Sequence, residues 1–471
     1  MNAKPPKPFN HQSVSLVHDL TTDRVFDCSD PGTGKTAVRL WAYATRRAAG
    51  SGAALVLAPR SLLRTTWLND IKRFTPQLRA VVADANNRKD AFAQDVDVYI
   101  TNTDAVKWLA EQPNSFFERF DELIVDESTA FKHHTSQRSK AAAKIAKHFT
   151  RRALMTGTPN GNSITDVWHQ MMVLDDGVRL GTSFFAFRNS VCTPVQVGRI
   201  AQAVQWKDKP GSAEAVFNQI GDVVIRHKFE DCVSIPDNFK YTVEYQLSPK
   251  QQKTYTELFE TSMLQMAGNN AVTAINAAAL ATKLLQVASG AVYDGTGAYR
   301  LVDNGRYEMI LDMVQQRKHS LVFFLWDHQK QELIAEATRR GLTFCVFDGK
   351  TSDKERESYV AAYQRGEYQV MFAHPKTAGH GLTLTKGTAT IWASPTYDLE
   401  HYAQGSKRQH RLGQTQKTET IVVVAKDTID ERAYERMESK NERMKHLLSL
   451  FEVTSPPPVP AKTTRKPRAK K

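Results

Sequence analysis

Residues 29–36, Ser-Asp-Pro-Gly-Thr-Gly-Lys-Thr, combine the residue types that bind a nucleoside triphosphate. They stand just before an amphipathic stretch of helical period, which predicts a glycine-rich turn whose backbone N–H groups face phosphate oxygens. Lys35 would reach the β- and γ-phosphates, and the Thr36 hydroxyl would bind Mg²⁺. Ser29 takes the place of the usual first glycine, and the alternative is a turn with an incidental lysine.

Two adjacent carboxylates, Asp126 and Glu127, end the apolar run that begins at Leu123. In an ATP hydrolase the first carboxylate holds Mg²⁺, usually through water, and the second polarises the attacking water. The alternative is a strand that ends in two solvated acids. Because the pair follows the phosphate loop by about 90 residues, the length of one lobe of β/α units, the combination favours an ATPase.

A pair of arginines, Arg408 and Arg411, lies in the basic segment 404–414. Three residues apart, they would share one face if this segment is helical. A guanidinium group suits the charge that spreads over the γ-phosphate in the transition state. The alternative is a solvated basic helix face, but its position after a second set of β/α units favours the catalytic interpretation.

Short apolar runs rich in β-branched and aromatic residues alternate with helical stretches, which predicts βαβ units with a parallel sheet. These runs form two series, at 55–59, 96–101, 122–127 and 152–157, and at 320–326, 343–349, 368–374, 389–394 and 419–425. The sequence therefore predicts an α/β protein with a first lobe over 1–164 and a second over 301–453. Residues 165–300 are predicted to be a mostly helical insertion or linker that includes the start of the second lobe, with one strand-like run near 240–247. Residues 454–471 are predicted to be a disordered basic tail.

The 471 residues carry a net charge of +13, which favours a polyanionic partner through release of condensed counterions. Hydrophobic residues make up 41% and charged residues 24%, as in soluble globular proteins. No apolar run approaches the roughly 18–20 residues of a membrane span, and the N-terminus has no apolar signal core. We therefore expect a soluble, non-secreted protein of the cytoplasm.

Taken together, the motifs resemble superfamily 2 helicase-like ATPases, most closely the Swi/Snf-type branch. The resemblance spans residues 9 to about 450, with the motifs in the family's order. Beyond the three segments above, it rests on Phe9-Asn-His-Gln12, Ala58-Pro-Arg-Ser-Leu-Leu…Trp67, Ile100-Thr-Asn-Thr103, Thr156-Gly-Thr-Pro-x-Gly-Asn162, Ile225-Arg-His-Lys228, Ile235-Pro236, Leu247-Ser-Pro-Lys-Gln-Gln252, Phe347-Asp-Gly-Lys-Thr…Arg356, Gly379-His-Gly-Leu-Thr-Leu384 and Gln404-x-x-x-Arg-x-x-Arg-x-Gly-Gln414.

The resemblance implies two RecA-like lobes that enclose ATP and Mg²⁺ between them. The ATP-binding residues that it implies are Gln12, Asp30, Gly32, Thr33, Gly34, Lys35 and Thr36, with Thr36 and Asp126 on the metal. The catalytic residues that it implies are Glu127, Asp126, Arg411, Arg408 and Gln404. Nucleic-acid contacts are implied at Arg60, Thr103, Thr351 and Thr377.

Three departures from the family pattern stand out. Thr129 occupies the place of a histidine that often couples ATP hydrolysis to nucleic-acid binding in this family. An ungapped match puts the family's Ser-Thr on His374-Pro375, so Thr377 is the nearest hydroxyl. The chain is short for the branch, which favours a minimal bacterial or phage motor, at work in a bacterial cytosol or in a phage-infected host cell.

The leading functional hypothesis is a DNA-dependent ATPase that translocates on or remodels duplex DNA in replication, recombination or repair. The first alternative is a strand-separating helicase or fork remodeller, which needs a wedge, and no inserted hairpin or added domain is evident in the sequence. The second is an ATP-gated DNA clamp with little turnover. The presence of both Glu127 and Arg411 disfavours it, because a clamp would be indicated by the loss of one of them. Expected partners are double-stranded DNA, with RNA ranked lower, and unidentified replication or recombination proteins. No membrane partner is expected.

Overall fold

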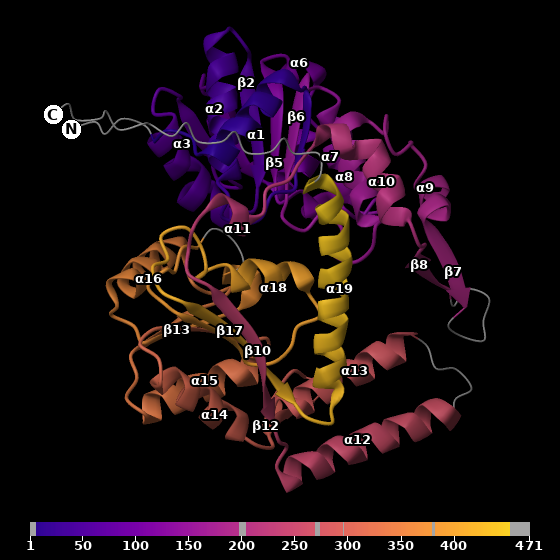
Figure 1. The fold of residues 1–471 in the computed structure, drawn as a ribbon, viewed down its shortest axis with the longest axis vertical. Coiled ribbons are helices and arrows are strands. Elements are labelled where there is room, and N and C mark those ends of the chain that lie inside the picture. Colours follow the sequence, from indigo (N-terminus) through magenta and orange to yellow (C-terminus); the bar gives the residue numbers. More distant parts are fainter. Residues whose placement is uncertain (1–5, 197–203, 269–273, 295, 379–381, 453–471) are drawn as a thin grey trace, which may run out of the picture.

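The computed structural model describes residues 6–196, 204–268, 274–294, 296–378 and 382–452. Within these ranges the chain forms two α/β lobes, each built on a parallel sheet (Figure 1). The predicted fold class is therefore confirmed. The predicted basic tail lies outside the described residues. No helix of the described part of the chain is long and apolar enough to cross a membrane.

Lobe 1 contains a seven-stranded sheet in the order β3-β4-β2-β5-β6-β1-β9, in which all neighbours are parallel. The central strand β2 is buried at every residue, as expected for a parallel strand covered on both faces. Its strands are β1 (Arg24–Asp27), β2 (Ala53–Ala58), β3 (Ala80–Ala83), β4 (Val98–Asn102), β5 (Phe120–Asp126), β6 (Arg151–Met155) and β9 (Val224–Ile225). Its helices are α1 (Asn10–Thr21), α2 (Lys35–Ala48), α3 (Asn69–Phe74), α4 (Arg88–Ala93), α5 (Val106–Leu109), α6 (Asn114–Phe117), α7 (Gln137–Ala146), α8 (Asp166–Asp175), α9 (Phe184–Val191) and α10 (Ser212–Ile220).

Lobe 2 contains a six-stranded parallel sheet in the order β10-β17-β16-β13-β15-β14. Its strands are β10 (Asn238–Tyr245), β13 (Ser320–Phe323), β14 (Phe344–Phe347), β15 (Val370–Ala373), β16 (Ala389–Trp392) and β17 (Thr418–Ala425). The helices after the linker helix α11 (Phe229–Cys232) are α12 (Pro249–Gly268), α13 (Ala274–Ala288), α14 (Gly305–Gln315), α15 (Asp327–Arg339), α16 (Asp353–Arg365), α17 (Pro375–Ala378), α18 (Leu399–Ser406) and α19 (Ile429–Glu452).

Residues 165–300 contain helices α8 to α13 and, as β10, the strand predicted near 240–247, together with further short strands that the sequence did not indicate. Strand β9 completes the sheet of lobe 1, and β10 pairs with β17 in lobe 2, so the chain changes lobe between residues 225 and 238. An antiparallel hairpin, β7 (Cys192–Gln196) with β8 (Val204–Asp208), extends from lobe 1 (Figure 1). A second small hairpin joins β11 (Ala291–Tyr293) to β12 (Tyr299–Leu301). The β7–β8 hairpin was not evident in the sequence, because its exposed polar strands lack the apolar runs used to find strands.

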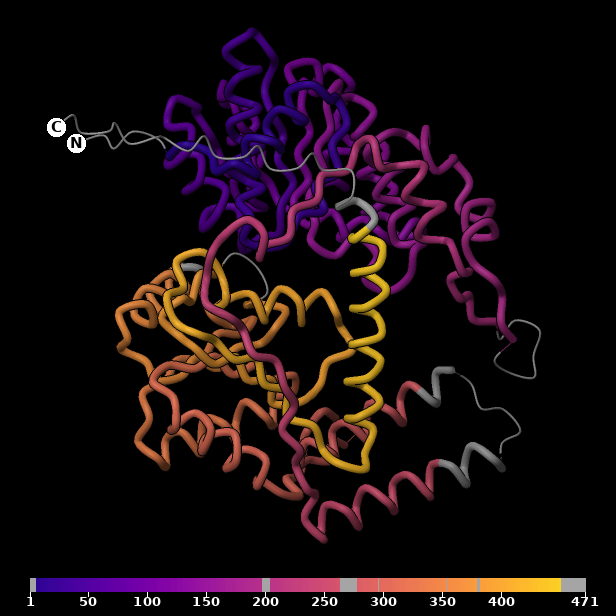
Figure 2. The backbone as a smooth tube through the Cα atoms, in the orientation of Figure 1, coloured from indigo at the N-terminus to yellow at the C-terminus, as the bar shows by residue number. Residues whose placement is uncertain are grey.

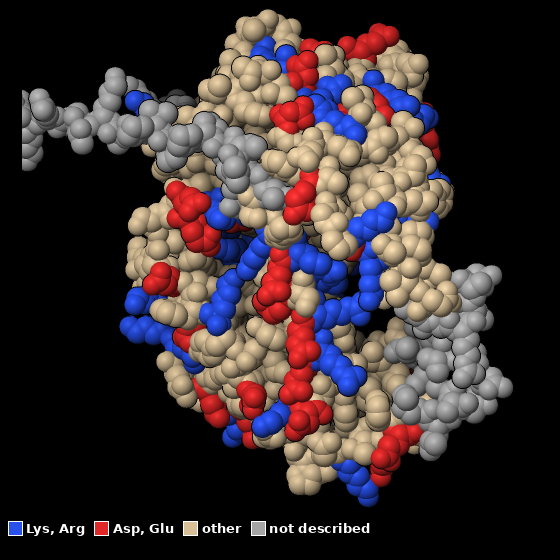
Figure 3. All heavy atoms as spheres, turned by 45° about the vertical axis from the view of Figure 1, so that its right-hand side comes forward, with Lys and Arg blue, Asp and Glu red and all other residues tan. Residues whose placement is uncertain are grey.

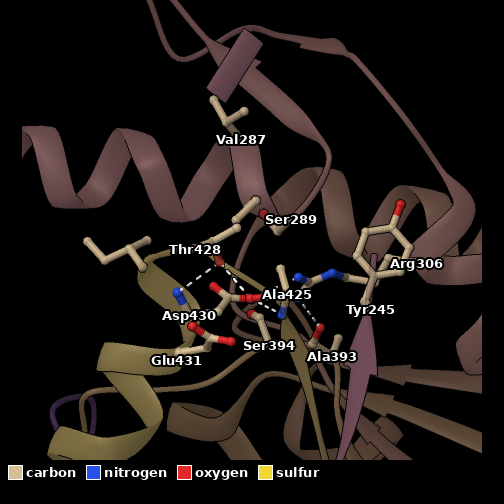
Figure 4. A network of polar contacts seen from close by, with 12 residues as sticks. Tyr245, Val287, Ser289, Arg306, Ala393, Ser394, Ala425, Thr428, Asp430 and Glu431 are labelled. Atoms are coloured by element: carbon tan, nitrogen blue, oxygen red, sulfur yellow. Dashed lines mark hydrogen bonds and ion pairs between the residues drawn. The ribbon is translucent and has the colours of Figure 1, made fainter. Parts of the chain in front are cut away.

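The long helix α19 starts in lobe 2 and runs back to lobe 1 (Figure 2). Its first turn is fixed by a buried ion pair, in which Arg306 Nη2 lies 2.7 Å from Asp430 Oδ2 (Figure 4). Arg306 also donates to the carbonyl of Ala393, and Asp430 accepts from the N–H of Ala425. Toward its other end, His446 Nε2 lies 3.0 Å from Glu214 of α10. The network therefore sets the direction of a helix that joins the two lobes.

We expect the Asp430→Ala variant to lose about 3–5 kcal/mol of unfolding free energy, because it leaves the Arg306 guanidinium buried without its carboxylate. Chemical denaturation of the whole chain measures this loss. Asp312→Ala, which breaks an ion pair with Arg340 at the surface, is the control and should cost at most about 1 kcal/mol. Equal stability of the two variants would contradict the assigned role of the buried pair.

Candidate active site

The phosphate loop joins the buried strand β1 to helix α2 and turns twice through the left-handed region. Gly32 has φ +93° and Gly34 has φ +84°. A Cβ atom on Gly34 would lie 2.2 Å from Gln12 Nε2, and one on Gly32 would lie 3.0 Å from the ring of Phe229. Both positions therefore require glycine, and the loop delivers the chain to the first turn of α2, where backbone N–H groups are free of helical partners.

Lys35 begins α2 and bends back over the loop. Its Nζ donates to the carbonyl of Ser29 at 2.5 Å and to that of Asp30 at 3.2 Å. Thr36 follows in the same helical turn and is half-buried. The ammonium and the hydroxyl therefore lie at the N-terminus of a helix, whose dipole favours an anion.

Two further residues predicted to bind ATP have protein partners. The side chain of Gln12 accepts from the N–H of Phe9 and donates to the carbonyl of Thr33 at 3.2 Å, so it braces the loop. The Asp30 carboxylate binds Arg226 Nη1 at 2.7 Å. Burial alone would raise the pKa of Asp30, but Arg226 holds this pKa below its usual value. The Asp30 carboxylate therefore binds the segment that connects the two lobes.

The acidic pair lies at the end of β5, two strands away from β1 in the sheet. Trp67 Nε1 donates to Asp126 Oδ2 at 3.0 Å and so orients this carboxylate. Glu127 has φ +51°, a left-handed conformation that is uncommon outside glycine and turns its side chain out of the strand direction. Burial, and then the charge of Asp126, raise the pKa of Glu127. A raised pKa at a functional position is typical of a group that takes a proton.

Arg408 and Arg411 are not helical, so the condition under which they would share a helix face is not met. Helix α18 ends at Ser406, and both arginines lie in the loop that follows. A shared acceptor aligns them instead, because the carbonyl of Leu382 accepts from Arg408 Nη1 at 3.3 Å and from Arg411 Nη1 at 2.5 Å. Arg408 Nε also donates to the carbonyl of Gln404. Loop geometry, not helical period, therefore brings the two guanidinium groups together.

The arginines of lobe 2 reach the phosphate loop of lobe 1. The Cβ of Arg411 is 3.9 Å from the place where a Cβ on Gly32 would lie. Burial, and then the charge of Arg411, lower the pKa of Arg408 to about 9, while Glu127 opposes this shift. Burial also lowers the pKa of Arg411. Such desolvated cations favour a bound polyanion, and their proximity to Gly32 and Glu127 makes one site from two lobes.

Polar contacts extend from the acidic pair in two directions. Thr129 Oγ1 donates to Glu400 Oε1 of lobe 2 at 2.9 Å. Within lobe 1, Ser128 Oγ donates to Gln170 Oε1 at 2.7 Å, and Gln170 Nε2 donates to the carbonyl of Pro159 at 2.7 Å. The acidic pair, predicted to be catalytic, is therefore flanked by a contact to the other lobe and by a link to the segment 156–162.

The residues predicted to contact nucleic acid form two equivalent pairs. Arg60 follows β2 and Thr103 follows β4, and these strands are neighbours in the first sheet. Thr351 follows β14 and Thr377 follows β15, which are neighbours in the second sheet. Arg60 is exposed, Thr351 and Thr377 are half-buried, and Thr103 is buried. Their roles stay predictions.

Sequence reasoning missed several residues of the site. Asp70 of α3 faces Arg411, Glu400 contacts Thr129, and Phe229 packs against Gly32. Burial raises the pKa of Asp70 to about 6, against the opposing charges of Arg73 and Arg411. No spacing rule could have found these residues, because each comes from an element distant in sequence and its role depends on how the lobes meet.

The residues present fit ATP with Mg²⁺. The loop offers backbone N–H groups and Lys35 to phosphates, and Thr36 and Asp126 are the oxygen donors that Mg²⁺ prefers. The side-chain oxygen of Gln404, buried beside the arginines, has no hydrogen-bond partner in the described structure. The site formed by the phosphate loop, the acidic pair and Gln404 therefore has hydrogen-bond donors and acceptors that a ligand could use.

The fold and this site define a two-lobed ATPase, with the phosphate loop on one lobe and paired arginines on the other. Comparison with protein families agrees, because residues 26–289, more than half of the 471, match the SNF2-related domain. Residues 305–413 match the helicase conserved C-terminal domain. The chain belongs to the SNF2-related family and is a helicase-like ATPase of the Swi/Snf type.

Relatives span phages and bacteria. The chain is 28% identical to protein p41 of Acyrthosiphon pisum secondary endosymbiont phage 1, over 92% of this chain and 96% of that protein. It is 23% identical to an uncharacterized ATP-dependent helicase, MG018 of Mycoplasma genitalium, over 88% of this chain but only 39% of that protein. The Sulfolobus solfataricus SWI2/SNF2 ATPase core in complex with dsDNA aligns over 96% of this chain and 97% of that one, with a TM-score of 0.44 and 19% identity.

We expect Glu127→Gln to abolish ATP turnover while ATP binding is largely retained, because the amide keeps the shape of the side chain but cannot take a proton. Lys35→Ala should weaken binding as well. Steady-state hydrolysis and binding of a fluorescent ATP analogue distinguish the two effects. The exposed Glu118→Gln in the same lobe is the control. Turnover by Glu127→Gln near the wild-type rate would show that another group is the base.

Arg411→Ala should lower turnover by roughly 10³–10⁵-fold, the contribution of arginine fingers in other NTPases. DNA affinity should change little, because the side chain lies at the phosphate loop. Arg408→Ala should have the weaker effect, and Arg365→Ala, a surface residue of lobe 2, is the control. Complete loss of DNA binding in Arg411→Ala would instead assign this residue to the DNA surface.

Proposed function

We propose that the protein is a DNA-dependent ATPase that moves along duplex DNA without efficient strand separation. The observation that carries this proposal is a basic groove between the lobes, with a volume of about 560 Å³. Figure 3 shows Lys and Arg side chains around the hollow beside α19. The lining residues are Asn162, Ser163, Gln205, Trp206, Lys207, Asp208, Arg436, Lys440 and Arg443.

The charges of this groove suit a phosphodiester backbone. Arg436, Lys440 and Arg443 stand at positions i, i+4 and i+7 of α19, so they share one face of the helix, and Lys207 faces them from β8. Among the described residues, the lining contains one acidic residue, Asp208, whose Oδ1 accepts a hydrogen bond from Ser163 Oγ at 2.7 Å. Phosphate contacts hold a protein in register on DNA without reading its bases, as a translocating motor requires.

The groove is joined to the catalytic pair. Lys440 Nζ of lobe 2 donates to Asn162 Oδ1 of lobe 1 at 3.0 Å. Asn162 closes the segment 156–162, which Gln170 connects to Ser128 beside Glu127. A change in lobe separation at the ATP site would therefore alter the groove, and strain in the groove would reach Glu127.

In this mechanism the protein supplies position, charge and a proton acceptor. When bound, ATP with Mg²⁺ supplies the phosphoryl group and the charge that draws the lobes together. Thr36 and Asp126 would hold the metal, Glu127 would take the proton of the attacking water, and Arg411 would stabilise the transition-state charge. We place this activity in replication, recombination or repair inside a bacterial host cell, and the relatives from a phage and from Mycoplasma genitalium support the bacterial setting.

A strand-separating helicase is the second candidate, and the β7–β8 hairpin is the observation that favours it. The hairpin projects from lobe 1, and its strand β8 lines the basic groove. Trp206 of β8 is covered by the guanidinium of Arg188, which lies 3.7 Å from the centre of its ring. The guanidinium occupies one face of the ring and leaves fewer faces on which a base could stack, so we favour the hairpin as a guide for an intact duplex.

We expect duplex DNA to stimulate hydrolysis more than single-stranded DNA or RNA does, and ATP to drive displacement of a third strand paired to a duplex. A forked duplex should open poorly, because opening costs on the order of 0.6–2.2 kcal/mol per base-pair step and the opened strands need to be trapped. The Glu127→Gln protein is the control for ATP dependence. Rapid unwinding of a long, blunt duplex without triplex displacement would favour the helicase.

A further inference from the structure

The linker between the lobes, residues 226–237, passes directly through the active site. It leaves strand β9 of lobe 1, forms the single turn α11 between the lobes, and enters β10 of lobe 2 (Figure 1). Nothing in the proposed chemistry uses it. Its contacts, however, are with the phosphate loop on one side and with the arginine loop on the other.

On the side of lobe 1, Asp30 holds the linker with both carboxylate oxygens. Oδ1 lies 2.7 Å from Arg226 Nη1, and Oδ2 accepts from the N–H of Phe229 at 3.0 Å. The N–H of Asp30 in turn donates to the carbonyl of His227 at 3.0 Å. The start of the linker is therefore fixed to the phosphate loop by a buried ion pair and by hydrogen bonds.

Phe229 lies between the two catalytic loops. Its ring packs against Gly32, where an added Cβ would lie 3.0 Å from it. The same ring meets His410 edge-on at 5.8 Å and carries the Lys407 ammonium 5.0 Å from its centre. Lys407 and His410 belong to the loop that holds Arg408 and Arg411, so one aromatic side chain contacts both loops.

On the side of lobe 2, the next residue of the linker contacts the arginine loop. Glu230 Oε1 lies 2.7 Å from Lys407 Nζ, and farther along the carbonyl of Pro236 lies 3.1 Å from His410 Nε2. The Phe229 N–H that binds Asp30 and the Glu230 carboxylate that binds Lys407 come from adjacent residues. Consecutive Cα atoms are only about 3.8 Å apart. The backbone between these two attachments is therefore too short to let one move far without the other.

We propose that Glu230 and Asp30 are positioning residues: through the linker they hold the arginine loop in register with the phosphate loop when the lobes close. The inference rests on the proposed role of Arg411. Catalysis depends on such register, since a misplacement of about 1 Å costs on the order of 100-fold in rate. The linker therefore sets the position of the arginine loop relative to the phosphate loop when the lobes close, in addition to connecting the two lobes.

The Glu230–Lys407 pair suits a test, because it can be removed without unfolding the protein. The Glu230 side chain is 59% exposed, and ion pairs at such sites contribute little to stability. The variants are Glu230→Lys, Lys407→Glu and the double exchange. The measurements are kcat and KM for ATP at saturating duplex DNA, with ATP affinity taken from a fluorescent analogue.

We expect each single variant to lower kcat by roughly fivefold, the factor that an exposed ion pair can account for, with KM and ATP affinity nearly unchanged. The double exchange should restore most of kcat. Asp30→Asn should lower kcat at unchanged ATP affinity, because the amide loses the charge that holds Arg226. A double exchange no better than either single variant, or a parallel loss of ATP affinity, would overturn the proposal.

Two controls separate this mechanism from other causes. Glu214→Lys breaks the His446 contact between α10 and α19, which also joins the lobes but lies away from the linker, and it should leave kcat within about twofold. A loss equal to that in Glu230→Lys would mean that lobe docking in general is responsible, and would overturn the linker's role. Normal turnover in Arg411→Ala would overturn the proposed role of Arg411 in stabilising the transition state, and the protein would then have no need to position that residue.

Discussion

Arg411 of lobe 2 lies beside Gly32 of lobe 1, and this contact is the constraint on which the rest of the structure depends. Lys35, Asp126 and Glu127 belong to lobe 1, while Arg408 and Arg411 belong to a loop of lobe 2. Neither lobe alone can surround a triphosphate. Both arginines are also desolvated, which lowers their pKa values and makes their position sensitive to small movements. The protein must therefore fix how two separate domains meet, and must do so reversibly.

Two connections of different strength serve this purpose. At the distal side, helix α19 is anchored in lobe 2 by the fully buried Arg306–Asp430 pair. It packs against α10 of lobe 1 with the buried Leu447 and Leu448 and makes the exposed His446–Glu214 contact there. At the active site, the linker is anchored in lobe 1 by Asp30 and meets lobe 2 through the half-exposed Glu230–Lys407 pair. The linker is buried at its lobe 1 end and half-exposed at its lobe 2 end. A half-exposed ion pair breaks and re-forms at little cost, so the lobe 2 end can move while the Asp30 anchor stays in place.

The sequence was most informative where function depends on neighbouring residues. The phosphate loop, the acidic pair and the order of the β/α units were predicted because glycine turns, apolar runs and their ends are local patterns. The arginine pair was identified from its spacing, but Arg408 and Arg411 are aligned by the carbonyl of Leu382, which no periodicity could indicate. The β7–β8 hairpin was missed because its strands are short and polar.

Asp30 shows that a motif residue can also serve the fold. The resemblance implies that it binds the nucleotide, and in the structure its carboxylate binds Arg226 and the backbone of Phe229, almost 200 residues away in sequence. A motif records that a residue type is needed at a position. It does not record whether the need comes from the ligand or from the fold that presents the ligand site.

Thr129 extends the same reasoning to the coupling between the lobes. Where a histidine often stands in this branch, a single hydroxyl donates to Glu400 of lobe 2. Glu400 is half-buried, and desolvation raises the pKa of its carboxyl. Its charge also raises the pKa of Glu127. A hydroxyl that donates to Glu400 only when the lobes are closed would therefore stabilise the negative charge of Glu400 and change the field at the catalytic base. In this chain the acidic pair, the threonine and the opposite lobe form one electrostatic unit, and the basic groove reaches that unit through Gln170 and Ser128.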